Sequence, residues 1–238
     1  MAILTRSLAL AILVCLLWPA YRAFVVGFSM LLENQALTMR LAPMALLGIG
    51  VERLTRRSLQ RFRVAEHELS HALAAIVLGR SIRRFVVTRY HGGLVEHEGS
   101  NGPLRHVNDH LIGLAPYFLP TLSLIPLLVR PFVEVSPWRI TLDLVIGFTL
   151  GWHLTSNVRE LRQNFHSRYF QSAVGGTVQS DLGHRGLAFS LVMIVVLWLL
   201  VHGAMLGLLT GGWAGTRAWA QAFAVGLHAQ WEAARALL

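Results

Sequence analysis

The stretch VAEHELSHALAAIVLG, residues 64–79, places two histidines and a glutamate at the start of an apolar run. On an α-helix, residues four apart lie on one face, so His67 and His71 can offer their imidazoles to a single metal ion. Glu68 then lies beside the coordination position that the two histidines leave open. This H-E-x-x-H pattern predicts a zinc site in which Glu68 is the general base that takes a proton from water.

The composition is that of a membrane protein. Of 238 residues, 54% are hydrophobic and 14% charged, with a mean hydropathy of +0.53, whereas a soluble domain usually carries about a quarter charged residues. Several apolar runs reach or approach the roughly 20 residues that cross a hydrocarbon core: 8–32, 104–129, 138–156 and 187–209. Two shorter runs cover 36–51 and 64–80. We therefore predict an all-α polytopic membrane protein, and expect ionisable residues inside its apolar segments to be functional.

The basic residues indicate the orientation of the chain in the membrane. All 21 are arginines, and residues 52–63 hold five of them, whereas 130–137 holds only Arg130. Since arginine-rich loops stay cytoplasmic, we expect 52–63 and 157–185 on the cytoplasmic side and 130–137 on the opposite side. The net charge of +9 is thus explained without nucleic-acid binding. A single cysteine, Cys15, allows no thiol cluster, so a metal must use His, Asp or Glu.

No repeat, low-complexity tract or long linker divides the chain, so we predict a single membrane domain over 1–238 that carries the metal motif. Its expected parts are N-terminal anchor spans (1–52), a catalytic core (60–206) and a C-terminal amphipathic helix (210–238). The first apolar run is interpreted as a retained anchor and not a signal peptide, because it continues to Leu32 without a clear cleavage site.

Residues 82–97 interrupt the helical pattern. β-branched and aromatic residues flank Gly92 and Gly93, which predicts one inserted β-hairpin. The run 104–129 contains three prolines, which should kink it or break it into pieces. Irregular backbone at membrane depth normally lines a cavity, so this run is expected to lie near the site.

The stretch HELSHALAAIVLGRSIRRFVVTRYHGG, residues 67–93, resembles the core of the site-2 protease family of intramembrane zinc metalloproteases. In that family the H-E-x-x-H helix is closed by a glycine and followed by a membrane-associated hairpin with paired glycines. The positions that match these features are Gly79, Phe85, Gly92 and Gly93. The resemblance implies zinc as cofactor and proteolysis of membrane-embedded regulators.

Two later segments extend the resemblance over about 60–206. LIGLAPYFLP, residues 111–120, is similar to the second core span of the small bacterial branch of the family. QSDLGHRG, residues 179–186, is similar to the segment that bears its third metal ligand, which implies Asp181. A bacterial inner membrane is the location that this resemblance implies.

The third ligand stays open on the residues alone. Asp181 precedes the apolar run 187–209 and can instead cap the N-terminus of a helix. Asp143 and His153 lie inside another apolar run, where each needs a polar partner, so either can be a ligand. Asn157 can donate a hydrogen bond to the oxyanion of the reaction, although polar residues also simply mark the end of a span.

We predict an intramembrane zinc metalloprotease whose partners are a membrane-protein or membrane-proximal substrate and the lipid bilayer. The hairpin with Gly92 and Gly93 offers a strand edge that can hold an extended substrate. The alternatives are a zinc hydrolase acting on a smaller substrate and a catalytically inactive membrane scaffold. The remaining histidines of the polar connections are expected to be solvated: His91, His97, His106, His110 and His184.

Overall fold

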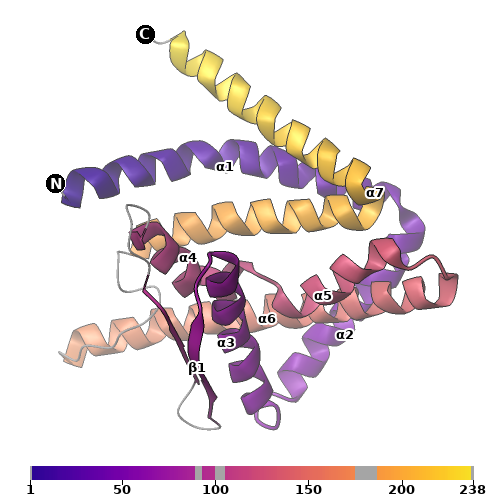
Figure 1. Ribbon diagram of the computed structural model, residues 1–238, viewed down its shortest axis with the longest axis horizontal. Helices are drawn as coiled ribbons and strands as arrows, with labels where there is room; N and C mark the ends of the chain where they lie inside the picture. Colours follow the sequence, from indigo (N-terminus) through magenta and orange to yellow (C-terminus); the bar gives the residue numbers. More distant parts are fainter. Residues whose placement is uncertain (1, 89–92, 100–104, 175–186, 237–238) are drawn as a thin grey trace. The chain divides into compact units, whose positions relative to one another are not determined.

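The computed structural model describes residues 2–88, 93–99, 105–174 and 187–236. The predicted fold class is confirmed, because the described residues form helices and one β-hairpin (Figure 1). In chain order the elements are α1 (Ala2–Glu33), α2 (Gln35–Leu54), α3 (Gln60–Val77), β1 (Ile82–Val87), β2 (Gly93–His97), α4 (Arg105–Phe118), α5 (Thr121–Val129), the 3-10 helix η1 (Arg130–Phe132), α6 (Ser136–Val174) and α7 (Leu187–Arg235).

The chain divides into two compact units. The first unit comprises Met1–Arg40, Leu127–Ile140 and Gly186–Leu238. The second comprises Leu41–Pro126 and Thr141–Arg185, and it contains the predicted metal motif.

In the first unit, α7 bends sharply at Gly212. This residue has φ 58° and ψ −140°, a conformation that favours glycine. A Cβ on Gly207 would lie 2.8 Å from the carbonyl oxygen of Gly215, although eight residues of straight helix span about 12 Å. The helix therefore folds back on itself, and α1 packs against it (Figure 1).

Glycines bring α2 and α6 close together in the second unit. A Cβ on Gly147 would lie 2.7 Å from the Leu41 carbonyl oxygen, and one on Gly151 would lie 2.8 Å from Ala45 Cα. Since these contacts advance in the same order along both helices, α2 and α6 run in the same direction. Larger side chains at these glycines would force the helices apart.

The helix of the metal motif, α3, ends in a Schellman motif. The Gly79 N–H donates to Ile76 O at 2.9 Å, and the Arg80 N–H donates to Ala75 O at 2.8 Å. Gly79 has φ 75°, which a residue without Cβ adopts at no steric cost. This glycine stops the helix and directs the chain into β1.

The predicted hairpin is confirmed as an antiparallel pair of β1 and β2. Phe85 lies opposite Val95, and Val87 lies opposite Gly93. Both strands pack against α3 (Figure 1). In the residues that the structure describes, the sheet has only these two strands, so each keeps one edge without a neighbouring strand.

Two helices in the described part of the chain are long and apolar enough to cross a membrane, Ala9–Glu33 and Leu187–Arg235. The predicted break in 104–129 is also found: α4 and α5 are bent by 82° where Pro120 intervenes, and together form a broken span or a re-entrant loop. The run 138–156 lies in α6, which is not among these candidate spans.

Candidate functional site

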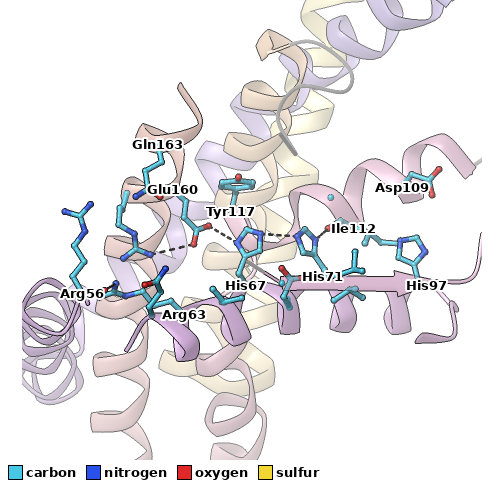
Figure 2. A pocket seen from close by; sticks show the side chains of 18 of the residues that line it. Arg56, Arg63, His67, His71, His97, Asp109, Ile112, Tyr117, Glu160 and Gln163 are labelled. Carbon is cyan, nitrogen blue, oxygen red and sulfur yellow. Dashed lines mark hydrogen bonds and ion pairs between the residues drawn. The ribbon is translucent and has the colours of Figure 1, made fainter. Parts of the chain in front are cut away.

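A cavity of about 780 Å³ in the second unit surrounds the H-E-x-x-H motif. Its walls come from α3, β2, α4, α6 and the turn after α2 (Figure 2). His67, Glu68 and His71 lie in the wall that α3 forms, Gly93 in the wall of β2, and Glu160 in the wall of α6. The fold therefore brings one strand and three helices to the predicted metal motif.

The two histidines direct the same ring nitrogen toward each other, as Figure 2 shows. His67 Nδ1 lies 2.8 Å from Glu160 Oε2, and His71 Nδ1 donates to the Ile112 carbonyl oxygen at 2.7 Å. Because both partners are acceptors, each Nδ1 carries the proton and each Nε2 has a lone pair in the neutral ring. The two Nε2 atoms are 3.2 Å apart.

This arrangement of donors fits a metal ion. Two lone pairs that face each other at 3.2 Å repel unless a cation or proton lies between them. Two nitrogens bound to one tetrahedral zinc at 2.0–2.1 Å would be about 3.3 Å apart, close to the spacing observed here. A histidine ligand that donates its other N–H to a carboxylate or carbonyl is also typical of zinc sites.

Glu68 lies beside the two histidines and against the hairpin. Its side chain is buried, with 7% of the residue exposed. A Cβ on Gly93 would lie 2.6 Å from both Cδ and Oε1 of Glu68, so the absence of a side chain at 93 makes room for this carboxylate. The hairpin thereby sets the position of the predicted general base.

We expect Gly93→Ala to lower activity on the order of 10²-fold while the protein stays folded and keeps its affinity for zinc. The added methyl displaces the Glu68 side chain from Cγ outward, and a displacement of about 1 Å at a reacting group can have an effect of this size. Steady-state kinetics and zinc titration measure the two quantities. Gly99→Ala is the control, since a Cβ there meets nothing within 4 Å. Equal rates for Gly93→Ala and Gly99→Ala would contradict the prediction that the absence of a side chain at Gly93 is needed to position Glu68.

Glu160 connects the histidines to a network of charges. Arg159 lies 3.7 Å from Glu160 Oε1 and also forms an ion pair with Glu52. Arg63 Nε lies 3.2 Å from Glu52 Oε1, and Glu52 is 2% exposed. The carboxylate that holds His67 is therefore itself held by residues of α2, α3 and α6.

Burial affects the two arginines of this network. Desolvation lowers the pKa of Arg63, and Arg56 lowers it further, while Glu66 and Glu160 oppose the shift. Desolvation also lowers the pKa of Arg159, and Glu160 opposes it. Both guanidinium groups nevertheless stay charged at neutral pH, because arginine keeps its proton in proteins.

We expect Glu160→Gln to weaken zinc binding by roughly 10- to 100-fold. The amide oxygen can still accept the N–H of His67, but the negative charge that favours the bound cation is lost. Competition with a fluorescent zinc chelator measures the affinity. Glu96→Gln makes the same change at an exposed position of β2 and should have no effect. Unchanged affinity in Glu160→Gln would show that this carboxylate is dispensable to the site.

Asn157 and His153 belong to a buried polar group beside the cavity. Asn157 Nδ2 donates to Tyr117 O at 2.9 Å and lies 3.0 Å from His153 Nε2. His153 Nδ1 lies 3.9 Å from Glu66 Oε1, and the Trp152 indole donates to Glu66 Oε2 at 2.7 Å. An oxyanion role for Asn157 would therefore require its amide to leave Tyr117 O.

The candidates for a third metal ligand do not join the two histidines in the described structure. In the part of the chain that the structure describes, no three His, Cys, Asp or Glu side chains come together as a metal site. Asp143, which is fully buried in α6, and His153 thus do not join the two histidines of α3. Asp181 and Gly92 lie outside the described residues, and their roles stay predictions.

Sequence reasoning missed Glu160 and misjudged His110. Glu160 lies in the segment 157–185, for which only the arginines were considered, and it is the only acidic residue in 157–168, the signal that could have drawn attention to it. His110 was expected to be solvated, but it is only 6% exposed in α4, because the helix begins before it and turns it inward. His97 lines the cavity, with Nδ1 3.1 Å from Arg80.

Comparison with known proteins identifies one family. The sequence pattern of the family described as Peptidase M50B-like matches residues 39–165, just over half of the chain. This range contains every residue that lines the cavity. No curated protein and no solved structure matches the chain.

Proposed function

Because the chain belongs to the Peptidase M50B-like family, we propose that it is an intramembrane zinc metalloprotease of the site-2 protease type. The observation that carries the proposal is the pair of Nε2 atoms of His67 and His71, 3.2 Å apart in a cavity that Glu68 shares. The substrates are membrane-embedded or membrane-proximal polypeptides.

His67 and His71 would hold a zinc ion through Nε2, with Asp181 as the third ligand. When bound, zinc supplies a positive charge that lowers the pKa of water to about 7 and polarises the substrate carbonyl. Glu160 and Ile112 O keep the two imidazoles in the tautomer that this role requires.

Glu68 is the general base and then the general acid. Its carboxylate accepts a proton from the attacking water as the new C–O bond forms at the scissile carbonyl. It then donates this proton to the amide nitrogen as the C–N bond breaks, which releases the amine. Burial of Glu68 against Gly93 supports this role, since it holds the carboxylate beside the histidines.

The hairpin binds the substrate in an extended conformation. A transmembrane helix keeps its carbonyl groups in internal hydrogen bonds, so it must unwind locally before water can reach them. A strand edge then pairs with the unwound backbone without requiring a particular sequence. Gly93, Leu94 and Val95 of β2 line the cavity, whereas no described residue of β1 does, which supports β2 as this strand. Gly92, which lies outside the described residues, is a second proposed substrate-binding position.

The protein is a multi-pass protein of a bacterial inner membrane, and its whole chain acts as one metalloprotease domain. The arginine-rich segments 52–63 and 157–185 face the cytoplasm. The ion pairs of Glu52 with Arg63 and Arg159 support a common side for both segments, because they join the two directly.

Asp181→Asn tests the third ligand. We expect zinc binding to weaken at least tenfold and activity to disappear, because an amide oxygen is neutral and binds zinc poorly. Asparagine caps a helix about as well as aspartate, so a capping residue would tolerate the change. Native zinc affinity together with native thermal stability in this variant would assign Asp181 to capping.

The proposed function is tested with purified protein and a model substrate that has a single membrane span. Zinc-dependent cleavage of this substrate, abolished by a chelator and restored by zinc, is expected. Zinc binding without cleavage of the span would favour a hydrolase of smaller substrates. A protein that neither takes up zinc nor cleaves would be a scaffold.

A further inference from the structure

A second groove, of about 930 Å³, lies between the C-terminal end of α2 and the middle of α6. Four arginines and one acidic residue line it: Arg53, Arg56, Arg159, Arg162 and Glu52. Ile49, Leu154 and Val158 form its apolar part. We propose that this groove, which shares Arg56 and Arg159 with the wall of the first cavity, binds the phosphate of an anionic phospholipid.

The described residues do not balance the charges of the groove. Glu52 is already paired with Arg63 and Arg159. None of the described acidic side chains forms an ion pair with Arg53, Arg56 or Arg162. These three guanidinium groups are exposed at the groove and present planar sets of donors, the geometry that suits phosphate oxygens.

The arginines lie at the same level on both helices. α2 and α6 run in the same direction, and the pair of Glu52 and Arg159 brings Arg53 at the end of α2, and Arg56 just after it, to the level of Arg162 in α6. Exposed apolar side chains lie next to this level: Leu46 (69%) and Leu47 (51%) precede Glu52 by more than one turn, Leu154 (37%) precedes Arg159 by more than one turn, and Val158 (50%) adjoins Arg159. Apolar surface beside a ring of arginines matches acyl chains beside headgroups.

The mixed walls favour a lipid over free phosphate. Inorganic phosphate would contact the arginines but would leave Ile49, Leu154 and Val158 exposed to water. An anionic phospholipid places its phosphate among the arginines and covers the apolar wall with an acyl chain, so both parts of the groove are used. Phosphatidylglycerol is the simplest probe with this chemistry.

Native mass spectrometry of the full chain in detergent tests the proposal. The native protein should bind phosphatidylglycerol at least tenfold more tightly than phosphatidylcholine. The triple variant Arg53→Gln, Arg56→Gln, Arg162→Gln should lose on the order of 100-fold in affinity for phosphatidylglycerol, from the usual contribution of each arginine near anionic lipid. The corresponding triple change to lysine should bind more tightly than the glutamine variant, because the charges remain, but less tightly than the native protein, because the planar sets of donors are lost.

A second triple variant, Arg139→Gln, Arg217→Gln, Arg235→Gln, removes the same charge from exposed positions in the first unit and should bind the lipid as the native protein does. Equal loss in both glutamine variants would overturn the site, as would native affinity in the groove variant. Displacement of the lipid by millimolar inorganic phosphate would also overturn the proposal, because it would show that the groove binds a free anion. Unchanged thermal stability and zinc content show that each variant is folded.

Discussion

Glu68→Gln is expected to lower turnover by roughly 10²- to 10⁴-fold and to leave the zinc content unchanged. Glutamine has nearly the same size and keeps a hydrogen-bond acceptor, but it cannot take a proton from water. The side chain is 7% exposed and lies against Gly93, so the isosteric amide fits the same space. The change therefore separates proton transfer from metal binding.

The measurement compares initial rates on a single-span substrate with the zinc content of the same preparations. Glu134→Gln, an exposed carboxylate in the first unit, is the control and should behave as the native chain. A Glu68→Gln protein that cleaves at more than a tenth of the native rate would remove Glu68 from the mechanism. Parallel loss of zinc would instead make it a residue that holds the metal site together.

His67→Ala should remove the metal. The substitution leaves His71 as the only imidazole of the motif, and the pair of Nε2 atoms at 3.2 Å is lost. It also deprives the Glu160 carboxylate of its partner at 2.8 Å, so two negative groups, Glu160 and Glu52, share the nearby arginines. We expect zinc content to fall from about one ion per chain to near zero, and cleavage with it.

Elemental analysis of the purified protein, followed by zinc titration, measures this loss. His228→Ala removes an exposed imidazole from α7 and should retain one zinc per chain. Zinc bound at native affinity by His67→Ala would place the metal elsewhere in the molecule. Together with Glu160→Gln, which weakens binding without abolishing it, this variant distinguishes a ligand from the residue that positions it.

The sequence by itself determined the local structure of this protein. The spacing of His67 and His71 on a helix, the glycine that ends this helix, the hairpin and the break at Pro120 all follow from backbone preferences over a few residues. Such features depend on neighbours along the chain, so the pattern of residues is sufficient to predict them. The apolar composition likewise indicated a membrane protein.

Only the tertiary structure decided which side chains complete the site. Glu160 meets His67 across 93 positions of sequence, and Arg159 meets Glu52 across 107. These pairs depend on how α2, α3 and α6 are rotated and shifted against one another, and close packing at Gly147 and Gly151 sets this for α2 and α6. Helical periodicity says which face a residue occupies but not which partner that face meets, and for this reason the acid that holds His67 and the paired arginines emerged only from the packed helices.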